Sequence, residues 1–341
     1  MINTSHVSPL TSYLITGGCG FIGTSLIAHL IKAIPDVKIR VLDNLSVGTR
    51  DDLAEVCDFT EIDITVPLAL NARSSSVELV SGDIRDAETC FQCCKGIDIV
   101  VHLAANTGVA PSVENPRQDM EANTTGTFNM LEAARGNRVE RFIFASSGAP
   151  VGEVEPPINE EKPPRPVSPY GASKLAGEGY CSAYYRTFGL KTVSLRFGNV
   201  YGPLSKHKSS VVAKFFKQAL AGETLEIYGN GSQTRDFIYI DDLIQAILLS
   251  VKTDTGGEVF QIATYRETTV NEIAQKIEGI VEKNTGRKVT VRYGEKRVGD
   301  VQRNYSDISK AARILGYTPQ FGLDEGLILT FEYFRKRLSL K

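Results

Sequence analysis

The heptapeptide Gly17-Gly18-Cys19-Gly20-Phe21-Ile22-Gly23 decides the fold of this chain. It follows a short apolar run at residues 13–16 and opens the segment 21–33, whose apolar residues recur at helical spacing. Glycines at such a turn let the backbone approach a pyrophosphate closely, and the N–H groups that begin the helix stabilise its charge. Because glycines also occur in plain turns, the motif indicates a pyrophosphate site only together with a suitable residue at the end of the next strand.

Asp43 closes that next strand, predicted over residues 38–42. An acidic residue at this place accepts hydrogen bonds from a ribose diol and repels a 2′-phosphate, so we expect NAD rather than NADP. Arg40 and Arg50 flank the position and leave the opposite preference open. Asp83-Ile84, after a further apolar run, is expected to reach the adenine, although an aspartate in such a turn also serves as a helix cap.

Strand-like and helix-like segments alternate along the first two thirds of the chain. Apolar runs at residues 77–80, 97–103, 141–145 and 192–196 alternate with amphipathic stretches such as 120–135 and 173–188. This rhythm predicts an α/β fold with a doubly wound parallel sheet of the Rossmann type. Residues 62–76 lack periodicity and are expected to form a surface insertion.

A second, smaller α/β lobe is expected towards the C-terminus. Helices are predicted at 211–221, 241–251, 270–285 and 322–336, separated by loops and short strands. We expect residues 1–198 to form the NAD-binding domain, with 236–264 returning to it. Residues 199–235 and 265–341 would then form a lobe over the carboxyl edge of the sheet, where open α/β folds bind ligands.

Composition excludes several classes of protein. The chain has 341 residues, 42% of them hydrophobic and 23% charged, with a formal net charge of −2. It therefore has no bulk attraction for nucleic acid or for a membrane surface. Neither a signal peptide nor a long apolar run is visible, so a cytoplasmic protein with reduced cysteines is expected. Cys90, Cys93 and Cys94 fit one face of a helix, and no metal site is expected.

Tyr170 and Lys174, in Tyr-Gly-Ala-Ser-Lys, are the candidate catalytic pair. Residues four apart on a helix project from one face, and a nearby ammonium stabilises a phenolate. Tyr170 would then act as a general base. Alone the motif is more often a solvated lysine beside a half-buried tyrosine, but here it follows the glycine turn and a strand ending in Ser146-Ser147. Those two hydroxyls could hydrogen-bond a sugar hydroxyl or carbonyl.

With these motifs in order, the chain resembles the extended short-chain dehydrogenases/reductases, in their NAD-dependent epimerase/dehydratase branch. The resemblance extends over nearly the whole sequence. Further matching segments are His102-Leu103-Ala104-Ala105, Asn123-Thr124-Thr125-Gly126-Thr127, Arg196-Phe197-Gly198-Asn199-Val200-Tyr201-Gly202-Pro203, Arg235-Asp236-Phe237-Ile238-Tyr239, Asp241-Asp242 and Arg297-Val298-Gly299-Asp300.

The resemblance implies a role for each matching residue. Tyr170, Lys174 and Ser147 would be catalytic. NAD would be held by Gly17, Gly20, Phe21, Ile22, Gly23, Asp43, Asn44, Asp83, Ile84, Leu103, Ala104, Ala105 and Asn123, together with Tyr170 and Lys174. The second lobe would bind a nucleotide sugar: Ser146, Ser147 and Asn199 at the sugar or its diphosphate, Arg235 and Arg297 at the diphosphate, and Asp300 at a ribose hydroxyl.

The expected reaction is 4-epimerisation of a UDP-sugar through a 4-keto intermediate. A 4,6-dehydratase of this family carries an Asp-Glu pair where this chain has Gly148 and Ala149. Glu153 is displaced from the position that a decarboxylase would use. Asn304 stands at the family's gate beside the sugar 2-substituent, which favours a UDP-hexose or UDP-N-acetylhexosamine. Pro150-Val151 replaces the usual loop sequence and leaves the sugar open.

Other outcomes stay open at this point. A UDP-glucuronate epimerase or decarboxylase, a 4,6-dehydratase and a reductase share the fold, and a non-catalytic NAD-binding regulator is disfavoured by the intact Tyr170 and Lys174. The resemblance implies a homodimer through helices at 120–135 and 173–188, and a role in polysaccharide biosynthesis.

Overall fold

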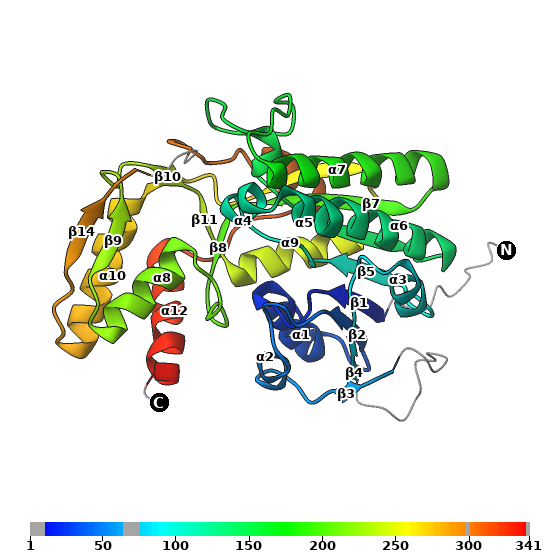
Figure 1. Ribbon diagram of the computed structural model, residues 1–341, viewed down its shortest axis with the longest axis horizontal. Helices are drawn as coiled ribbons and strands as arrows, with labels where there is room; N and C mark the ends of the chain where they lie inside the picture. The colour runs from blue at the N-terminus through cyan, green and yellow to red at the C-terminus, as the bar shows by residue number, and fades with distance from the viewer. Residues whose placement is uncertain (1–10, 64–75, 297–300, 339–341) are drawn as a thin grey trace.

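The computed structural model describes residues 11–63, 76–296 and 301–338 (Figure 1). Within them, the main sheet has the strand order β12-β7-β6-β5-β1-β2-β4-β3, and every neighbouring pair is parallel. The strands are β1 (Ser12–Thr16), β2 (Lys38–Asp43), β3 (Thr60–Glu61), β4 (Val77–Ser81), β5 (Ile99–His102), β6 (Arg141–Ser147), β7 (Lys191–Phe197) and β12 (Glu258–Ile262). The predicted α/β class and parallel sheet are confirmed.

The strand order reverses at β1. From β1 the chain proceeds outward to β2 and β4, and then crosses back to β5 on the other side. The connections that leave the carboxyl ends of β1 and β5 therefore run in opposite directions, and this is the place where open α/β sheets bind ligands. The glycine heptapeptide begins at this point, directly after β1.

Helices cover both faces of the sheet. Helices α1 (Phe21–Ala33) and α9 (Ile240–Lys252) pack together on one face, and α3 (Ala87–Cys93), α6 (Gly126–Gly136) and α7 (Pro169–Phe188) cover the other. Side chains alternate along β1: Tyr13 and Ile15 belong to one buried cluster and Leu14 to the other. This alternation is the two-sided burial expected of an inner parallel strand.

The smaller lobe lies beside the sheet, at the left of Figure 1. Helices α8 (Val211–Ala221), α10 (Val270–Thr285) and α12 (Leu323–Leu338) pack together, beside the parallel pair β9 (Leu225–Tyr228) and β14 (Val291–Gly294). Two further pairs of short strands lie in this half of the chain. Strand β8 (Asn199–Tyr201) pairs with β11 (Phe237–Tyr239), and β10 (Thr234–Arg235) pairs with β13 (Thr268–Thr269). Helix α11 (Ser309–Leu315) lies near β12.

The helix predicted over 120–135 contains a wider turn. It consists of α5 (Pro116–Met120), a π-helical turn η1 (Glu121–Thr125) and α6. A π-helical turn inserts an extra residue into the helix and rotates the side chains that follow. Periodicity alone did not predict it, because apolar spacing on either side of one inserted residue still fits a helix.

Three cysteines take the places that their spacing predicted. Cys90, Cys93 and Cys94 are buried at the end of α3, and they pack with Leu14 and Val80 rather than lining a polar site. In the part of the chain that the structure describes, no helix is long and apolar enough to cross a membrane. The insertion expected at 62–76 lies mostly outside the described residues.

Candidate active site

The glycine turn is built for close approach. Gly17 has φ +68°, and a Cβ added to it would lie 2.9 Å from the backbone nitrogen of Ala104. A Cβ on Gly23 would lie 2.5 Å from the carbonyl oxygen of Gly17. Helix α1 begins without a side-chain cap on Gly20. Its first N–H groups therefore face the turn as donors for an anion.

Asp43 braces the turn from the end of β2. Its carboxylate accepts hydrogen bonds from the backbone nitrogens of Cys19, at 3.0 Å, and Leu45, at 2.8 Å. Burial raises the pKa of this carboxyl, and the two backbone donors oppose the shift. Arg40, one alternative partner considered for a 2′-phosphate, is fully buried against Glu78, so it does not face the turn.

Asp83 lies beside Asn44 at the same edge of the sheet. The Asn44 amide donates to Asp83 at 3.1 Å, and Arg85 binds the carboxylate at 2.8 Å. Hydrogen bonding to Arg85 lowers the pKa of Asp83 to about 2. The next residue, Ile84, is buried under Gly126, where an added Cβ would lie 2.6 Å from it. These contacts hold the predicted adenine-binding corner in place.

A buried histidine ties β5 to β1. His102 lies between the hydroxyl groups of Thr16, at 2.8 Å, and Thr127, at 3.1 Å. Burial lowers the pKa of His102 to about 3. The same Thr16 hydroxyl accepts the N–H of Ala104 at 3.1 Å. The segment Leu103-Ala104-Ala105 is thereby fixed against the glycine turn.

Asn123 is a buried hub of the π-helical turn. Its amide receives the N–H of Asn106 at 2.7 Å and donates to the carboxylate of Asp119 at 2.8 Å and to the hydroxyl of Ser173 at 3.3 Å. Asp119 is also buried, with only 1% of its surface exposed. Sequence reasoning named Asn123 but missed Asp119 and Ser173, which lie behind Tyr170 and Lys174.

Tyr170 and Lys174 lie on one face of α7, as their spacing predicted. The Lys174 ammonium is 5.9 Å from the centre of the Tyr170 ring. Burial raises the pKa of Tyr170 to about 12, and a hydrogen bond with Ser147 opposes the shift. Burial likewise lowers the pKa of Lys174 to about 8, while Asp119 and Glu178 act against it. The three predicted catalytic residues thus meet at the end of β6.

Ser146 and Ser147 point in different directions. Ser147 hydrogen-bonds with Tyr170, whereas Ser146 is buried and donates to Glu178 at 2.5 Å. Glu178 forms a buried bidentate pair with Arg196, at 2.8 and 2.7 Å. Both serines contact α7, and Ser147 is the one that meets Tyr170. The predicted contact of Ser146 with the substrate stays a prediction.

The loop after β6 forms a short turn beside the catalytic residues. A 3-10 turn, η2 (Ala149–Val151), follows Gly148, and the N–H of Ala149 donates to the Ser147 hydroxyl at 3.2 Å. A Cβ on Gly148 would meet only the amide of Asn304, at 3.9 Å. Gly148 and Asn304, two of the positions expected to govern the sugar, therefore lie close together, and an added Cβ on Gly148 would be in van der Waals contact with the Asn304 amide.

The second lobe contributes Asn199 and Arg235. Asn199 begins β8 and is half-buried; its backbone N–H donates to Asp236 at 2.7 Å. The Arg235 guanidinium donates to the carbonyl oxygens of Thr234, at 2.6 Å, and Val301, at 2.8 Å. Arg297 and Asp300, the other two predicted nucleotide contacts, lie outside the described residues.

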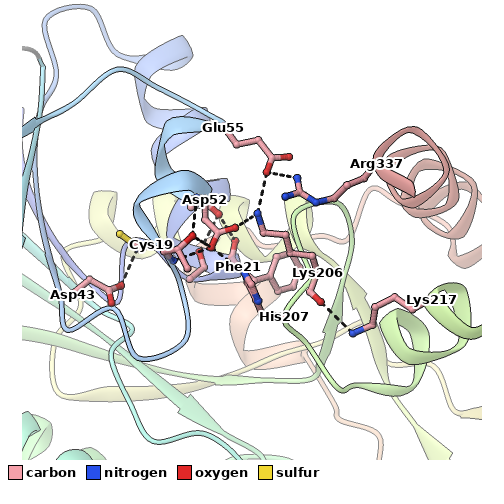
Figure 2. Close-up of polar contacts among 12 residues, drawn as sticks. Cys19, Phe21, Asp43, Asp52, Glu55, Lys206, His207, Lys217 and Arg337 are labelled. Carbon is pink, nitrogen blue, oxygen red and sulfur yellow. Dashed lines mark hydrogen bonds and ion pairs between the residues drawn. The ribbon is translucent and has the colours of Figure 1, made fainter. Parts of the chain in front are cut away.

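A cluster that joins the two lobes was not predicted. It consists of Asp52 and Glu55 at α2 (Arg50–Ala54), Lys206 and His207 in the loop after β8, and Arg337 in α12 (Figure 2). We call these five residues the interlobe cluster. Its members come from three distant parts of the chain, and no local motif marks them.

Residues 13–263 match the family described as the NAD dependent epimerase/dehydratase family. The UDP-glucose 4-epimerase of Mycolicibacterium smegmatis is 34% identical over 329 residues, covering 95% of this chain and 98% of that protein. The structure of UDP-glucose 4-epimerase from Thermotoga maritima with UDP-glucose has a TM-score of 0.85 and 36% identity, covering 96% of this chain and 99% of that chain.

Other relatives carry different activities. The UDP-N-acetylglucosamine 4-epimerase of Methanobrevibacter ruminantium, solved with UDP-N-acetylmuramic acid, has a TM-score of 0.84 and 30% identity, covering 96% of this chain and 99% of that one. Proteins named UDP-glucuronate 4-epimerase and dTDP-glucose 4,6-dehydratase are similar as well. The relatives therefore share the fold but differ in the reaction and in the sugar.

The chain belongs to the NAD-dependent epimerase/dehydratase family and is an enzyme that uses NAD. The cradle fits the cofactor: the Cβ positions of Gly17 and Gly23 are occupied by neighbouring backbone, and the uncapped start of α1 offers donors to a pyrophosphate. Asp43 fits a ribose diol at the end of β2.

Proposed function

We propose that this enzyme catalyses NAD-dependent 4-epimerisation of a UDP-sugar through a 4-keto intermediate. The observation that carries the proposal is the meeting of Ser147, Tyr170 and Lys174 at the end of β6, beside the cofactor turn. Gly148 and Ala149 add no acid or base to that set. A site with one proton acceptor suits removal and return of a proton at a single hydroxyl.

Each catalytic residue has a definable task. Tyr170 takes the proton of the sugar 4-hydroxyl, and Ser147 holds the same oxygen through its hydroxyl. The Lys174 ammonium favours the phenolate form of Tyr170. NAD would be held by the glycine turn and Asp43, and its chemistry would be to take up a hydride from carbon 4 of the sugar and return it. The chain's part is to keep the oxygen at carbon 4 within reach of Tyr170 throughout.

The sugar pocket favours a neutral hexose, with room for a 2-acetamido group. Gly148 has no side chain and Asn304 is short, and a Cβ on Gly148 would have only the Asn304 amide within 4 Å. A large aromatic at either position would fill that space. UDP-hexose and UDP-N-acetylhexosamine are therefore the proposed substrates, with Asn199, Arg235, Arg297 and Asp300 proposed to hold the UDP.

Product analysis tests the reaction. The purified protein is incubated with NAD and, in turn, with UDP-glucose, UDP-N-acetylglucosamine or UDP-glucuronate. We expect the carbon-4 epimer of a neutral sugar at unchanged mass. Release of carbon dioxide would establish a decarboxylase instead, and a product lighter by one water would establish a dehydratase.

We further propose a cytoplasmic homodimer that serves polysaccharide biosynthesis. Three aromatic side chains, Phe128, Tyr180 and Phe188, lie 39%, 40% and 53% exposed on α6 and α7. Covering them with a second copy would bury apolar surface on two paired helices. Light scattering tests this: Phe128→Glu with Tyr180→Glu should yield monomers.

A further inference from the structure

The loop that follows β8 reaches across to the cofactor side of the molecule. Its Lys206 ammonium forms an ion pair with the Asp52 carboxylate and lies 3.3 Å from Glu55 (Figure 2). His207 contacts the other oxygen of Asp52 at 3.0 Å. The side chains of Lys206 and Asp52 are only 15% and 8% exposed, so water screens this pair weakly.

Asp52 is in turn part of the corner that covers the glycine turn. It accepts the backbone N–H of Thr49 at 2.8 Å and the Thr49 hydroxyl at 2.7 Å, in a reciprocal capping box. Gly48, the residue before Thr49, packs so closely against the glycine turn that an added Cβ would lie 2.2 Å from the carbonyl oxygen of Cys19. Asp52 is thus connected to the glycine turn through Thr49 and Gly48.

The loop itself is held from the second lobe. The Lys217 ammonium on α8 donates to the carbonyl oxygens of Lys206, at 3.1 Å, and Lys208, at 2.9 Å. Arg337 on α12 donates to Glu55 at 2.7 Å. Burial opposes ionisation of Asp52, but hydrogen bonds from Lys206 and Thr49 outweigh it and lower the pKa of that carboxyl. Asp52 therefore remains charged and attached to both lobes.

We infer that the interlobe cluster is a latch on the cofactor turn, and that Lys206 is the positioning residue whose ion pair with Asp52 sets how fast NAD leaves the enzyme. Opening the crevice separates the loop after β8 from α2 and releases the corner at Gly48-Thr49. Closing it restores the ion pair and holds the turn around the pyrophosphate. In this arrangement Lys206 contacts none of the reacting atoms and takes no part in proton transfer.

The test is the NAD dissociation rate of the purified, NAD-loaded enzyme, followed by displacement with fluorescent etheno-NAD. Lys206→Met should release NAD about tenfold faster, and Lys206→Arg should restore most of the difference. Lys214→Met is the matched control, because Lys214 pairs with Glu226 inside the second lobe. A release rate for Lys206→Met equal to that of wild type, or matched by Lys214→Met, overturns the inference.

A double-mutant cycle separates the latch from a loss of folding. Asp52→Asn should add little to the NAD release rate of Lys206→Met, because both changes remove the same ion pair. Additive effects in the cycle would reject the latch even if Lys206→Met were unstable.

Discussion

The ammonium of Lys174 donates to the backbone carbonyl oxygen of Ala145 at 2.9 Å. This bond places the lysine under the last residues of β6, one turn of helix below Tyr170. The charge is buried between that strand and α7, and the acidic groups Asp119 and Glu178 favour it electrostatically. Asp119 therefore influences both Tyr170, the proposed base, and Lys174.

Replacing Tyr170 by phenylalanine should abolish turnover while sparing the cofactor. The change removes the proton acceptor but leaves the glycine turn and Asp43 in place, so we expect kcat to fall about 10³-fold or more. Titration calorimetry should give an NAD Kd within about twofold of wild type. Tyr180→Phe, on the exposed side of the same helix, is the control. A Tyr170→Phe enzyme that turns over normally would remove Tyr170 from the mechanism.

Removing the charge of Asp119 should move the pH profile to lower pH. Asp119 raises the pKa of Tyr170 and also acts to raise that of Lys174. In Asp119→Asn both pKa values fall, so the acidic and basic limbs of kcat/KM shift together by about 0.5–1 pH unit. Glu114→Gln, an exposed neighbour, should leave the profile unmoved. A lower rate with an unshifted profile would indicate only a packing role.

His102 should make the fold acid-sensitive. Its pKa is near 3 in the folded protein and 6.5 in a model peptide, so between these values only the unfolded chain binds the proton. Stability therefore falls as pH drops from about 6.5, by up to about 1.4 kcal/mol per pH unit. Urea unfolding of His102→Gln should show a shallower loss between pH 6 and pH 4 than wild type. His29→Gln, an exposed change, should retain the wild-type slope.

Enlarging Asn304 should close the pocket to acetamido sugars. Asn304→Tyr places an aromatic ring in the space beside Gly148, where the 2-substituent is proposed to lie. We expect kcat/KM for UDP-N-acetylglucosamine to fall about 100-fold and that for UDP-glucose to change by less than about threefold. Asn304→Ser should keep both. Equal losses on the two substrates would mean that Asn304 does not border the 2-position.

Sequence patterns predicted those parts of the fold whose structure depends on residues close together in the chain. The glycine turn, the start of α1 at Phe21 and the end of β2 at Asp43 are consecutive in sequence, and each follows from the residues beside it. The pair Tyr170 and Lys174 needed only the helical repeat. For the same reason β1, β2, β4, β5, β6 and β7 lie within a few residues of their predicted positions, whereas β3 and β12 were not predicted.

Contacts between distant segments could not be read in this way. The pairing of Lys206 with Asp52 depends on how a loop of the second lobe meets a corner of the first, and neither residue belongs to a recognisable motif. Asp119 acts on Tyr170 and Lys174 across the contact between α5 and α7, which are about 50 residues apart in the chain. The alternation of β6 was predictable, but which serine faces Tyr170 depended on the helix packed behind the strand.

Ser146 and Ser147 also restrict the insertions and deletions that strand β6 can tolerate. They are neighbours on one strand, yet one completes the buried Glu178–Arg196 pair and the other meets Tyr170. A one-residue deletion within β6 would move every later side chain to the opposite face of the sheet. The Glu178–Arg196 pair and Tyr170 would then both lose their contact with a serine, so we expect insertions and deletions to be excluded from β6.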